Sequence, residues 1–269
     1  MTEENKLITE RKKKLEAIKL NNKAYPNTFR KKDYANNISD KYRDLEKEDI
    51  AEKNIPVSIA GRLLTIRNMG NSSFANLHDE SGNIQIYLQK KQVGEDSYAL
   101  FNNLDLGDIV GIEGVLFKTR TGELTINTSS IMLLSKSLRP LPEKFHGIAD
   151  IEIKYRQRYL DLMINPETKI LFKTRSKIVS QIRNFFIEDD YLEVETPMMH
   201  MIPGGAAAKP FVTHHNSLDL DLYLRIAPEL FLKRCIIGGY EKVFEINRSF
   251  RNEGLSVKHN PEFTMIEFY

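Results

Sequence analysis

The stretch GNIQIYLQK, residues 82–90, decides the first fold prediction through its alternation of apolar and polar side chains. Side chains in an extended strand point alternately to opposite sides, so Ile84, Ile86 and Leu88 share one face. The residues between them face the other way. The stretch therefore predicts a strand that buries one face and turns the other outward.

Neighbouring stretches show the same period of two, with Gly or Asp at the turns between them. A short helix is expected near residues 96–104, before the fourth strand. Five strands with this interruption predict a small closed barrel of the OB type. The strands are expected within residues 57–70, 72–80, 82–90, 107–123 and 124–134.

The outward face of this barrel carries candidate binding groups. Ala75 and Leu77 share the inward face of the second strand, so Phe74 and Gln85 stand outside, with Arg67 near the end of the first strand. A ring that stacks on a base, worth roughly 1–3 kcal/mol, beside an amide that reads the base edge is typical of single-stranded nucleic-acid platforms. A second interpretation is open on these residues alone: Phe74 packs beneath the N-terminal helix.

The start of the chain is basic, although the formal net charge of the whole is only +2. Between Lys6 and Lys32, ten Lys or Arg residues stand against two Glu. Leu7, Leu15 and Ile18 form a narrow apolar stripe, which predicts a surface helix across this segment. Its basic face would suit a phosphate backbone, and a merely solvated helix is the alternative.

Composition excludes several classes of protein. With 41% hydrophobic and 28% charged residues the chain has the balance of a soluble globular protein. No apolar run has the length of a membrane span, and no signal peptide is evident, so we expect a cytoplasmic protein with no membrane partner. The single cysteine, Cys235, cannot form an internal disulfide, and no histidine cluster has metal-ligand spacing.

The second half of the chain predicts an α+β domain around an antiparallel sheet. Asp150 is expected to cap a helix over 151–164, and a second helix is expected over 168–187. Strands are expected in LEVETP, LDLDLYLRI and VFEINRSFR, with a helix in APELFLKRCII. The expected domains are a basic helical segment, the barrel, a proline-containing linker and the α+β domain, at residues 1–54, 55–137, 138–150 and 151–269.

The last twenty residues, FRNEGLSVKHNPEFTMIEFY, predict a hairpin with the groups of a nucleotide site. The Arg251 fork fits a phosphate, the Phe263 face suits a purine, and Lys258 and His259 extend toward further phosphates. No glycine-rich phosphate loop is needed for this arrangement. The alternative is an ordinary hairpin that carries an ion pair between Arg251 and Glu267.

These motifs resemble those of a known family. FRNEG followed by HNPEFTMIEFY resembles motif 2 of the class II aminoacyl-tRNA synthetases, and RSKIVSQIRNFFIEDDYLEVETP resembles their motif 1. The stretch IPGGAAAKPFVTHHNSLDLDLYLRIAPELFLKR resembles the lysyl members of that family. The resemblance covers residues 7–269, and its motifs are long and ungapped.

The resemblance implies ATP-dependent ligation of L-lysine to lysine tRNA through a lysyl-adenylate. There is no enzyme nucleophile in such a scheme, so catalysis depends on positioning and charge stabilisation. The implied catalytic residue is Arg251, which would clamp the α-phosphate and the lysine carboxylate. The implied ATP contacts are Glu253 and Asn260 at the adenine, Phe263 stacked on it, and Lys258 and His259 at the outer phosphates.

The resemblance also implies the lysine-binding residues. Glu229 and Glu267 would face the substrate ammonium, because an unpaired buried charge costs several kcal/mol. Gly205 would lie near the amino end of the substrate, and Tyr269 would complete the site. Taken alone, Glu229 could equally complement a helix N-terminus.

The barrel resembles the anticodon-binding domain of the family, which implies that Arg67, Phe74, Gln85 and Glu123 read the anticodon. Motif 1 implies a homodimer, with the helix of residues 168–187 packed against the partner chain. No stretch resembles motif 3 or the magnesium-binding acidic residues, so Mg²⁺ ligands are expected downstream of Tyr269 and no metal site is expected within the chain. Alternatives are a non-catalytic tRNA-binding fragment or regulatory paralogue and, ranked behind these, an aspartyl or asparaginyl relative.

Overall fold

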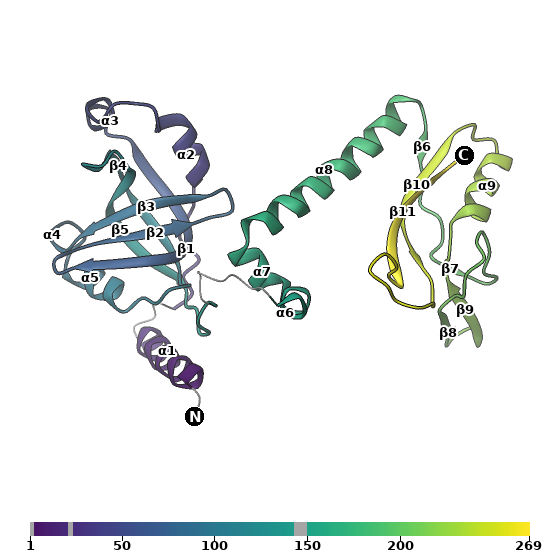
Figure 1. Cartoon of the computed structure of the whole chain (residues 1–269), viewed down its shortest axis with the longest axis horizontal. Helices are drawn as coiled ribbons and strands as arrows, with labels where there is room; N and C mark the ends of the chain where they lie inside the picture. Colours follow the sequence, from purple (N-terminus) through teal and green to yellow (C-terminus); the bar gives the residue numbers. More distant parts are fainter. Residues whose placement is uncertain (1–2, 21–23, 143–149) are drawn as a thin grey trace. The chain divides into compact units, whose positions relative to one another are not determined.

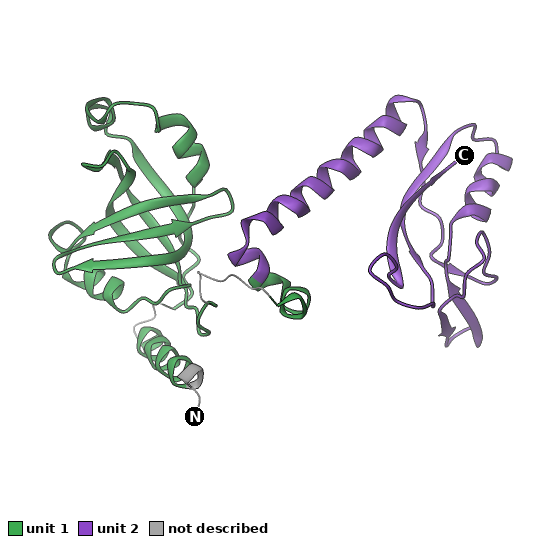
Figure 2. Cartoon of the chain, in the orientation of Figure 1, with its two compact units in different colours: residues 1–160 green, residues 161–269 purple. Residues whose placement is uncertain are grey.

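The computed structural model describes residues 3–20, 24–142 and 150–269, and the side chains of residues 3–5 are not described. The chain divides into two compact units, Met1–Leu160 and Asp161–Tyr269 (Figure 2). Each unit is described by itself below. Within the described ranges, no helix combines the length and the apolar character that crossing a membrane requires.

The first unit is built around a closed five-stranded barrel with strand order β1-β2-β3-β5-β4 (Figure 1). The pairs are antiparallel except β3 with β5, which is parallel. The prediction of an OB-type barrel is confirmed. The strands are β1 (Pro56–Met69), β2 (Ser72–His78), β3 (Asn83–Gln89), β4 (Ile109–Lys118) and β5 (Leu124–Ser135).

Alternation sorts the side chains of the barrel as predicted. Along β3, Ile84, Ile86 and Leu88 are 5%, 0% and 0% exposed, and Ala75 and Leu77 on β2 are buried beside them. These residues belong to one apolar core cluster together with residues from the other strands. Burial of this face is the main driving force for the barrel, at about 25 cal/mol for each Å² removed from water.

Short helices flank the barrel: α2 (Ala35–Tyr42), α3 (Lys47–Lys53), α4 (Lys90–Val93) and α5 (Glu95–Asn102). The helix predicted between the third and fourth strands is α5, which buries Tyr98 and Phe101. Ala35 and Ile38 of α2 and Ile50 of α3 join the same core cluster.

The N-terminal helix α1 (Glu3–Leu20) is shorter than predicted. Residues 24–34 are not helical, since Pro26 has no N–H group to donate to a helix. Residues 21–23, which include Lys23 of the predicted basic segment, lie outside the described residues. The basic segment is therefore a helix only in its first part.

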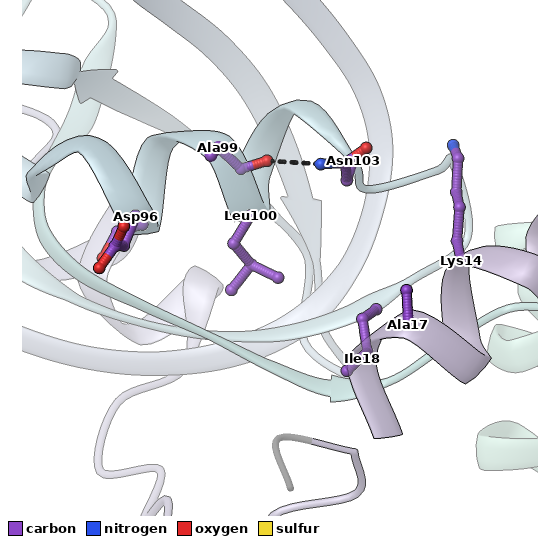
Figure 3. A pocket seen from close by; sticks show the side chains of 8 residues that line it. Lys14, Ala17, Ile18, Asp96, Ala99, Leu100 and Asn103 are labelled. Atoms are coloured by element: carbon purple, nitrogen blue, oxygen red, sulfur yellow. Dashed lines mark hydrogen bonds between the residues drawn. The ribbon is translucent and has the colours of Figure 1, made fainter. Parts of the chain in front are cut away.

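Two basic residues of α1 hold it on the barrel unit. The Arg11 guanidinium donates to the carbonyl oxygens of Ser137 and Arg139, at 3.0 and 3.1 Å. Lys14 Nζ lies 2.7 Å from an Asp105 carboxylate oxygen. Ile18 of α1 lines a pocket that also contains residues of α5 (Figure 3). The basic side chains of Arg11 and Lys14 therefore help to hold α1 in place.

The helix predicted over 151–164 is divided into α6 (Ile151–Arg156) and α7 (Arg158–Ile164). Asp150 caps α6 as predicted, accepting from the backbone N–H groups of Glu152 and Ile153. The backbone leaves the helical conformation at Gln157, with φ −121° and ψ 55°. A break of one residue does not visibly change the spacing of the apolar residues around it. The sequence therefore predicted one continuous helix, and that prediction was wrong.

The second unit contains two three-stranded sheets, ordered β11-β10-β6 and β7-β9-β8. The helix predicted over 168–187 is α8, slightly longer than expected. Together these elements confirm an α+β class. They are α8 (Pro166–Glu188), β6 (Leu192–Glu193), β7 (Met199–His200), β8 (Val212–His215), β9 (Leu220–Leu224), α9 (Glu229–Ile237), β10 (Val243–Phe250) and β11 (Glu262–Phe268).

Two details of this unit differ from the prediction. The pair β6–β10 is parallel, so the sheet is not wholly antiparallel, and β6 contains only the first two residues of LEVETP. Leu218 lies outside β9 and is 63% exposed, because Asp219 adopts φ +49° in the turn before the strand. Alternation alone gives no sign of that turn.

Candidate functional site

An aromatic row lies on the outward face of the barrel. Phe74 on β2 is the direct register partner of Tyr87 on β3, and their ring centroids are 4.5 Å apart. Phe117 of β4 lies 6.0 Å from Tyr87 on its other side. The phase of alternation predicted that Tyr87 faces outward together with Gln85, but only Phe74 was taken as a candidate binding ring.

A polar group lies beside the aromatic row. The Gln85 amide donates to a Glu123 carboxylate oxygen at 3.0 Å, and the Thr125 hydroxyl donates to the amide oxygen of Gln85 at 2.9 Å. Arg67, exposed on β1, is the register partner of Phe74. The structure therefore brings the four predicted residues of this face, Arg67, Phe74, Gln85 and Glu123, to adjoining positions on β1, β2, β3 and the β4–β5 turn.

The alternative for Phe74, packing beneath the N-terminal helix, receives no support from the contacts of that helix. Helix α1 contacts Asp105, Ser137 and Arg139 through Lys14 and Arg11. The Phe74 ring packs on Tyr87, as described above.

In the second unit, Arg251 lies at the end of β10 with its guanidinium over the ring of Phe263, 5.2 Å from the centroid. Its backbone N–H donates to the Pro261 carbonyl oxygen at 2.9 Å, which closes the hairpin. Arg251 Nε is buried without a hydrogen-bond partner. Among the described residues no ion pair joins Arg251 to Glu267, so the ion pair of the ordinary-hairpin alternative does not form. A buried, unpartnered guanidinium N–H beside a ring fits a phosphate-bearing, aromatic ligand.

The loop between β10 and β11 carries the other predicted ATP residues. Glu253 accepts from the backbone N–H of Lys209 at 3.2 Å, and Asn252 N–H donates to the Lys209 carbonyl at 2.7 Å. His259 Nδ1 is 2.7 Å from the Ser256 hydroxyl. Lys258, His259 and Asn260 are exposed, so the structure places them on the loop that follows Arg251 without fixing their contact with a ligand.

The predicted lysine-binding residues other than Arg251 come together at the other end of β11. The Tyr269 hydroxyl donates to a Glu267 carboxylate oxygen at 2.9 Å. Burial raises the pKa of Glu267 above its ordinary value, and the nearby charge of Glu229 raises it further, although the Tyr269 hydrogen bond opposes this. Burial and the bond to Glu267 raise the pKa of Tyr269 to about 12. The two carboxylates therefore repel one another and would be stabilised by a cation.

Gly205 lies directly against this cluster and has φ +88°. A Cβ atom at this position would lie 2.9 Å from Glu229 Cβ and 3.1 Å from Ala227 Cβ. Both the backbone conformation and the close approach require glycine. The predicted association of Gly205 with Glu229 is thus present in the geometry.

Lys233 is a member of this cluster that sequence reasoning missed. Its Nζ lies 2.6 Å from a Glu229 carboxylate oxygen and 5.4 Å from the ring centroid of Tyr269. The signal was available, because Glu229 and Lys233 have the i, i+4 spacing of a helical ion pair. The chain's own ammonium therefore shows that these groups can hold one.

The arginine end and the carboxylate end share one face of β11. Phe263, Met265 and Glu267 are every second residue of that strand, so their side chains point to the same side. At roughly 3.4 Å per residue, Phe263 and Glu267 are about 13 Å apart. Facing them across the hairpin are Ser249, Asn247 and Glu245 of β10.

A buried ion pair supports the carboxylate end. Arg225 Nη1 lies 2.7 Å from a Glu245 carboxylate oxygen, with the two side chains 4% and 5% exposed. The Thr196 hydroxyl donates to the second Glu245 oxygen at 2.6 Å, and Arg225 Nε donates to the Arg248 carbonyl. Because Glu245 pairs with Glu267 in the hairpin register, this network fixes the backbone next to the cluster.

No group of three or more His, Cys, Asp or Glu residues suited to a metal ion occurs in the part of the chain that the structure describes.

Helix α8 exposes its apolar stripe. Leu171, Ile178, Ile182 and Phe185, which define the predicted partner face, are 66%, 54%, 37% and 66% exposed.

Comparisons with known proteins identify a domain in each part of the chain. Residues 57–134 match the family model for the OB-fold nucleic acid binding domain, and residues 150–269 match the model for class II tRNA synthetases (D, K and N). The chain therefore contains a class II tRNA synthetase domain and an anticodon-binding OB domain. The resemblance based on motifs 1 and 2 is confirmed.

Within this class, the chain is similar to lysine–tRNA ligases. It is 57% identical to the enzyme of Nitrosomonas europaea, and 58% identical to those of Methylobacillus flagellatus and Neisseria meningitidis. Each alignment covers 99% of this chain and 52–53% of the relative. The chain thus spans about half the length of the curated relatives that it matches.

Proposed function

We propose that this chain forms part of a lysine–tRNA ligase that activates L-lysine with ATP and transfers the lysyl group to lysine tRNA. In the first step a lysine carboxylate oxygen attacks the α-phosphate, and pyrophosphate leaves. In the second step a ribose hydroxyl of the terminal tRNA adenosine attacks the lysyl carbonyl, and AMP leaves. As a tRNA-charging enzyme it would act in the cytoplasm.

The observation that carries the proposal is the grouping of Glu229, Glu267 and Tyr269 around an ammonium, that of Lys233. An L-lysine side chain brings the same chemical group. An aspartate side chain would meet two carboxylates and the single ammonium of Lys233, which already pairs with Glu229, and this opposes the aspartyl alternative. The lysine-specific relatives point to the same substrate.

Arg251 has the principal role in the activation step. Its guanidinium would bridge the α-phosphate and the substrate carboxylate, bringing two like-charged groups together and stabilising the charge that develops between them. Phe263, which lies beneath this guanidinium, would stack on the adenine, with Glu253 and Asn260 at its edge. Lys258 and His259 would neutralise the outer phosphates.

Family membership implies Mg²⁺ as the companion of ATP. Since the described residues hold no metal-ligand cluster, no step is assigned to a metal here.

The outward face of the barrel would read the tRNA anticodon. The support is the array of Arg67, Phe74, Gln85 and Glu123 on an OB-type barrel, because rings and amides are the groups that recognise unpaired bases. Exposed Lys12 and Lys13 of α1 would flank the RNA phosphates, since Arg11 and Lys14 are already used to hold the helix.

The exposed stripe of α8 would form a homodimer interface. Leu171, Ile178, Ile182 and Phe185 expose more apolar surface than a solvated helix needs, and such patches mark interaction sites.

The test is lysine-dependent exchange of pyrophosphate into ATP by the full-length protein that carries this sequence. Glu229→Gln and Glu267→Gln should each raise the KM for lysine roughly 10- to 100-fold, the effect of losing a charged hydrogen bond, with the KM for ATP nearly unchanged. Glu241→Gln, on an exposed side chain of the same unit, is the matched control. Equal effects on both substrates would contradict the lysine assignment, and wild-type protein without exchange would favour the non-catalytic RNA-binding alternative.

A further inference from the structure

One ammonium group of the chain already lies at the carboxylate end of the candidate site. Lys233 Nζ is 2.6 Å from a Glu229 carboxylate oxygen and 5.4 Å from the ring centroid of Tyr269. Burial raises the pKa of Glu267, and the charge of Lys233 is among the effects that oppose this rise. The Lys233 ammonium therefore lies among the three side chains proposed to receive the ammonium of L-lysine. Two ammonium groups in that place would repel one another strongly.

The position of this contact on α9 explains why it forms and why it is weak. Glu229 and Lys233 are one helical turn apart at the start of α9, which packs against β10 (Figure 1). Residues four apart on a helix face the same side, so the contact needs no other part of the fold. The Lys233 side chain is 50% exposed and that of Glu229 is 29% exposed. Because water competes for both charges, such an ion pair adds little stability, and Lys233 can turn its ammonium to water at little cost.

The neighbouring ion pair of the same unit is built differently. Arg225 and Glu245 have side chains that are 4% and 5% exposed, and Arg225 also donates to two backbone carbonyl oxygens. This pair is fixed, because separating it would leave a buried charge uncompensated. Of the two pairs, the one between Glu229 and Lys233 can open to admit a ligand.

We propose that the Lys233 ammonium is a resident counter-ion of this site, which the ammonium of L-lysine displaces from Glu229 when the substrate binds. In the empty site, Lys233 compensates one of two carboxylates that otherwise repel one another. In the occupied site it turns to water, and the substrate takes over its contact with Glu229. The inference rests on the proposed function, because it requires L-lysine to bind at Glu229 and Glu267.

Displacement has a measurable consequence, because the substrate loses part of its binding free energy in opening the pair between Glu229 and Lys233. Lys233→Met keeps an unbranched apolar side chain but has no charge to displace. In the full-length protein, this variant should bind L-lysine more tightly. The Kd, measured by isothermal titration calorimetry without ATP, should fall roughly 2- to 5-fold, the contribution of an exposed ion pair. If Lys233 only held Glu229 in place, its removal would weaken binding instead.

Three further variants separate displacement from a change of fold. Lys233→Arg keeps the cation and should bind L-lysine as the wild type does. Lys242→Met is the matched control, since Lys242 is also ion-paired and partly exposed but pairs with Asp189 and lies over the ring of Tyr191. This control should leave the Kd for L-lysine unchanged. In a Glu229→Gln background, Lys233→Met should have much less effect, because the pair no longer exists. Circular dichroism compares the fold of all variants.

The outcomes separate this inference from the proposed function. Tighter binding by Lys233→Met, absent from Lys233→Arg and dependent on Glu229, supports displacement. An unchanged or raised Kd in Lys233→Met, while Glu229→Gln still weakens binding, would overturn the role of resident counter-ion and leave the proposed lysine site standing. An equal gain in the Glu229→Gln background would also overturn that role, since the charge would then act at a distance. If Glu229→Gln does not weaken L-lysine binding, the proposed lysine site fails and this inference fails with it.

Discussion

The barrel unit and the second unit bury their apolar side chains in different ways. The barrel closes its sheet, and the core cluster within residues 35–133 fills its interior. The second unit has two open sheets, and most of the large apolar side chains that are exposed in the described residues belong to it. Closure gives the barrel a complete core of its own, whereas the apolar stripe of α8 in the second unit stays exposed.

The two units nevertheless share one device, a buried ion pair. In the barrel unit, Lys136 Nζ lies 2.7 Å from Asp108, and both side chains are fully buried. In the second unit, Arg225 and Glu245 form the equivalent pair beside the carboxylate cluster. The barrel pair ties β5 to the start of β4, away from the aromatic row, while the Arg225 pair lies next to proposed substrate groups.

The largest expected effect comes from breaking the barrel pair. Lys136→Met keeps the bulk of the side chain but removes the charge that faces Asp105 and Asp108. Asp105 keeps its contact with Lys14, but leaving the buried Asp108 carboxylate without its cation should lower the free energy of unfolding of this unit by about 3–5 kcal/mol. Urea unfolding followed by circular dichroism measures it, with exposed Lys53→Met as the control; a loss below about 1 kcal/mol would show that the pair does not hold the barrel.

A smaller effect is expected in the second unit from Gly205→Ala. The new Cβ would meet Glu229 and Ala227, and the residue would be held at φ +88°, which costs about 1–3 kcal/mol. Gly254→Ala is the matched control, because no atom lies within 4 Å of a Cβ there and its φ is not positive. Urea unfolding of the second unit should separate the two variants, and equal stabilities would mean that Gly205 can move away from Glu229 without cost.

The contrast between the units also explains what the sequence could predict. A closed barrel buries one face of every strand, so the alternation of Ile84, Ile86 and Leu88 reports its architecture directly. In the second unit, strand pairing depends on contacts between distant segments, and the shortness of β6 leaves no periodic signal. The break at Gln157, near the end of the first unit, leaves none either. The spacing of apolar residues predicts a strand or helix best where the fold buries one face of that element along its whole length.

The same distinction applies to the sites. Motif resemblance identified Gly205, Glu229 and Glu267, and the structure brings these three together. It could not show that Lys233 already forms an ion pair with Glu229, since a motif names residues and not the partners that they find in the fold. Tyr87 was not chosen as a binding residue for a related reason. What distinguishes it is the packing of its ring against two other aromatic rings, and the sequence does not show these contacts.

The smallest expected effect is the opposite response of the two units to acid. The side chain of Asp79 in the barrel unit is 2% exposed. Burial alone would raise the pKa of its carboxyl. The hydrogen bonds that it accepts from Lys31, Ser81 and the backbone N–H groups of Ala35 and Gly82 outweigh burial and lower this pKa to about 2. A lowered folded-state pKa contributes stability that is present above the unfolded value near 4 and lost as pH falls toward 2, amounting to at most about 2 kcal/mol.

Glu267 in the second unit behaves in the other sense. Its pKa is raised, first by burial and then by Glu229, so its protonated form is favoured by folding. A raised folded-state pKa contributes stability that is present below the unfolded value and lost as pH rises through the folded value. Acidification from pH 7 to about pH 3 should therefore weaken the barrel unit through Asp79 while it relieves charge repulsion in the second unit through Glu267.

Urea unfolding at several pH values, resolved into the two units by hydrogen exchange, measures how the stability of each unit depends on pH. Asp79→Asn should flatten the acid slope of the barrel only, and Glu267→Gln should flatten that of the second unit only. A single common slope that neither variant changes would show that these two carboxyls do not set the response, and that the difference between the units is one of packing alone.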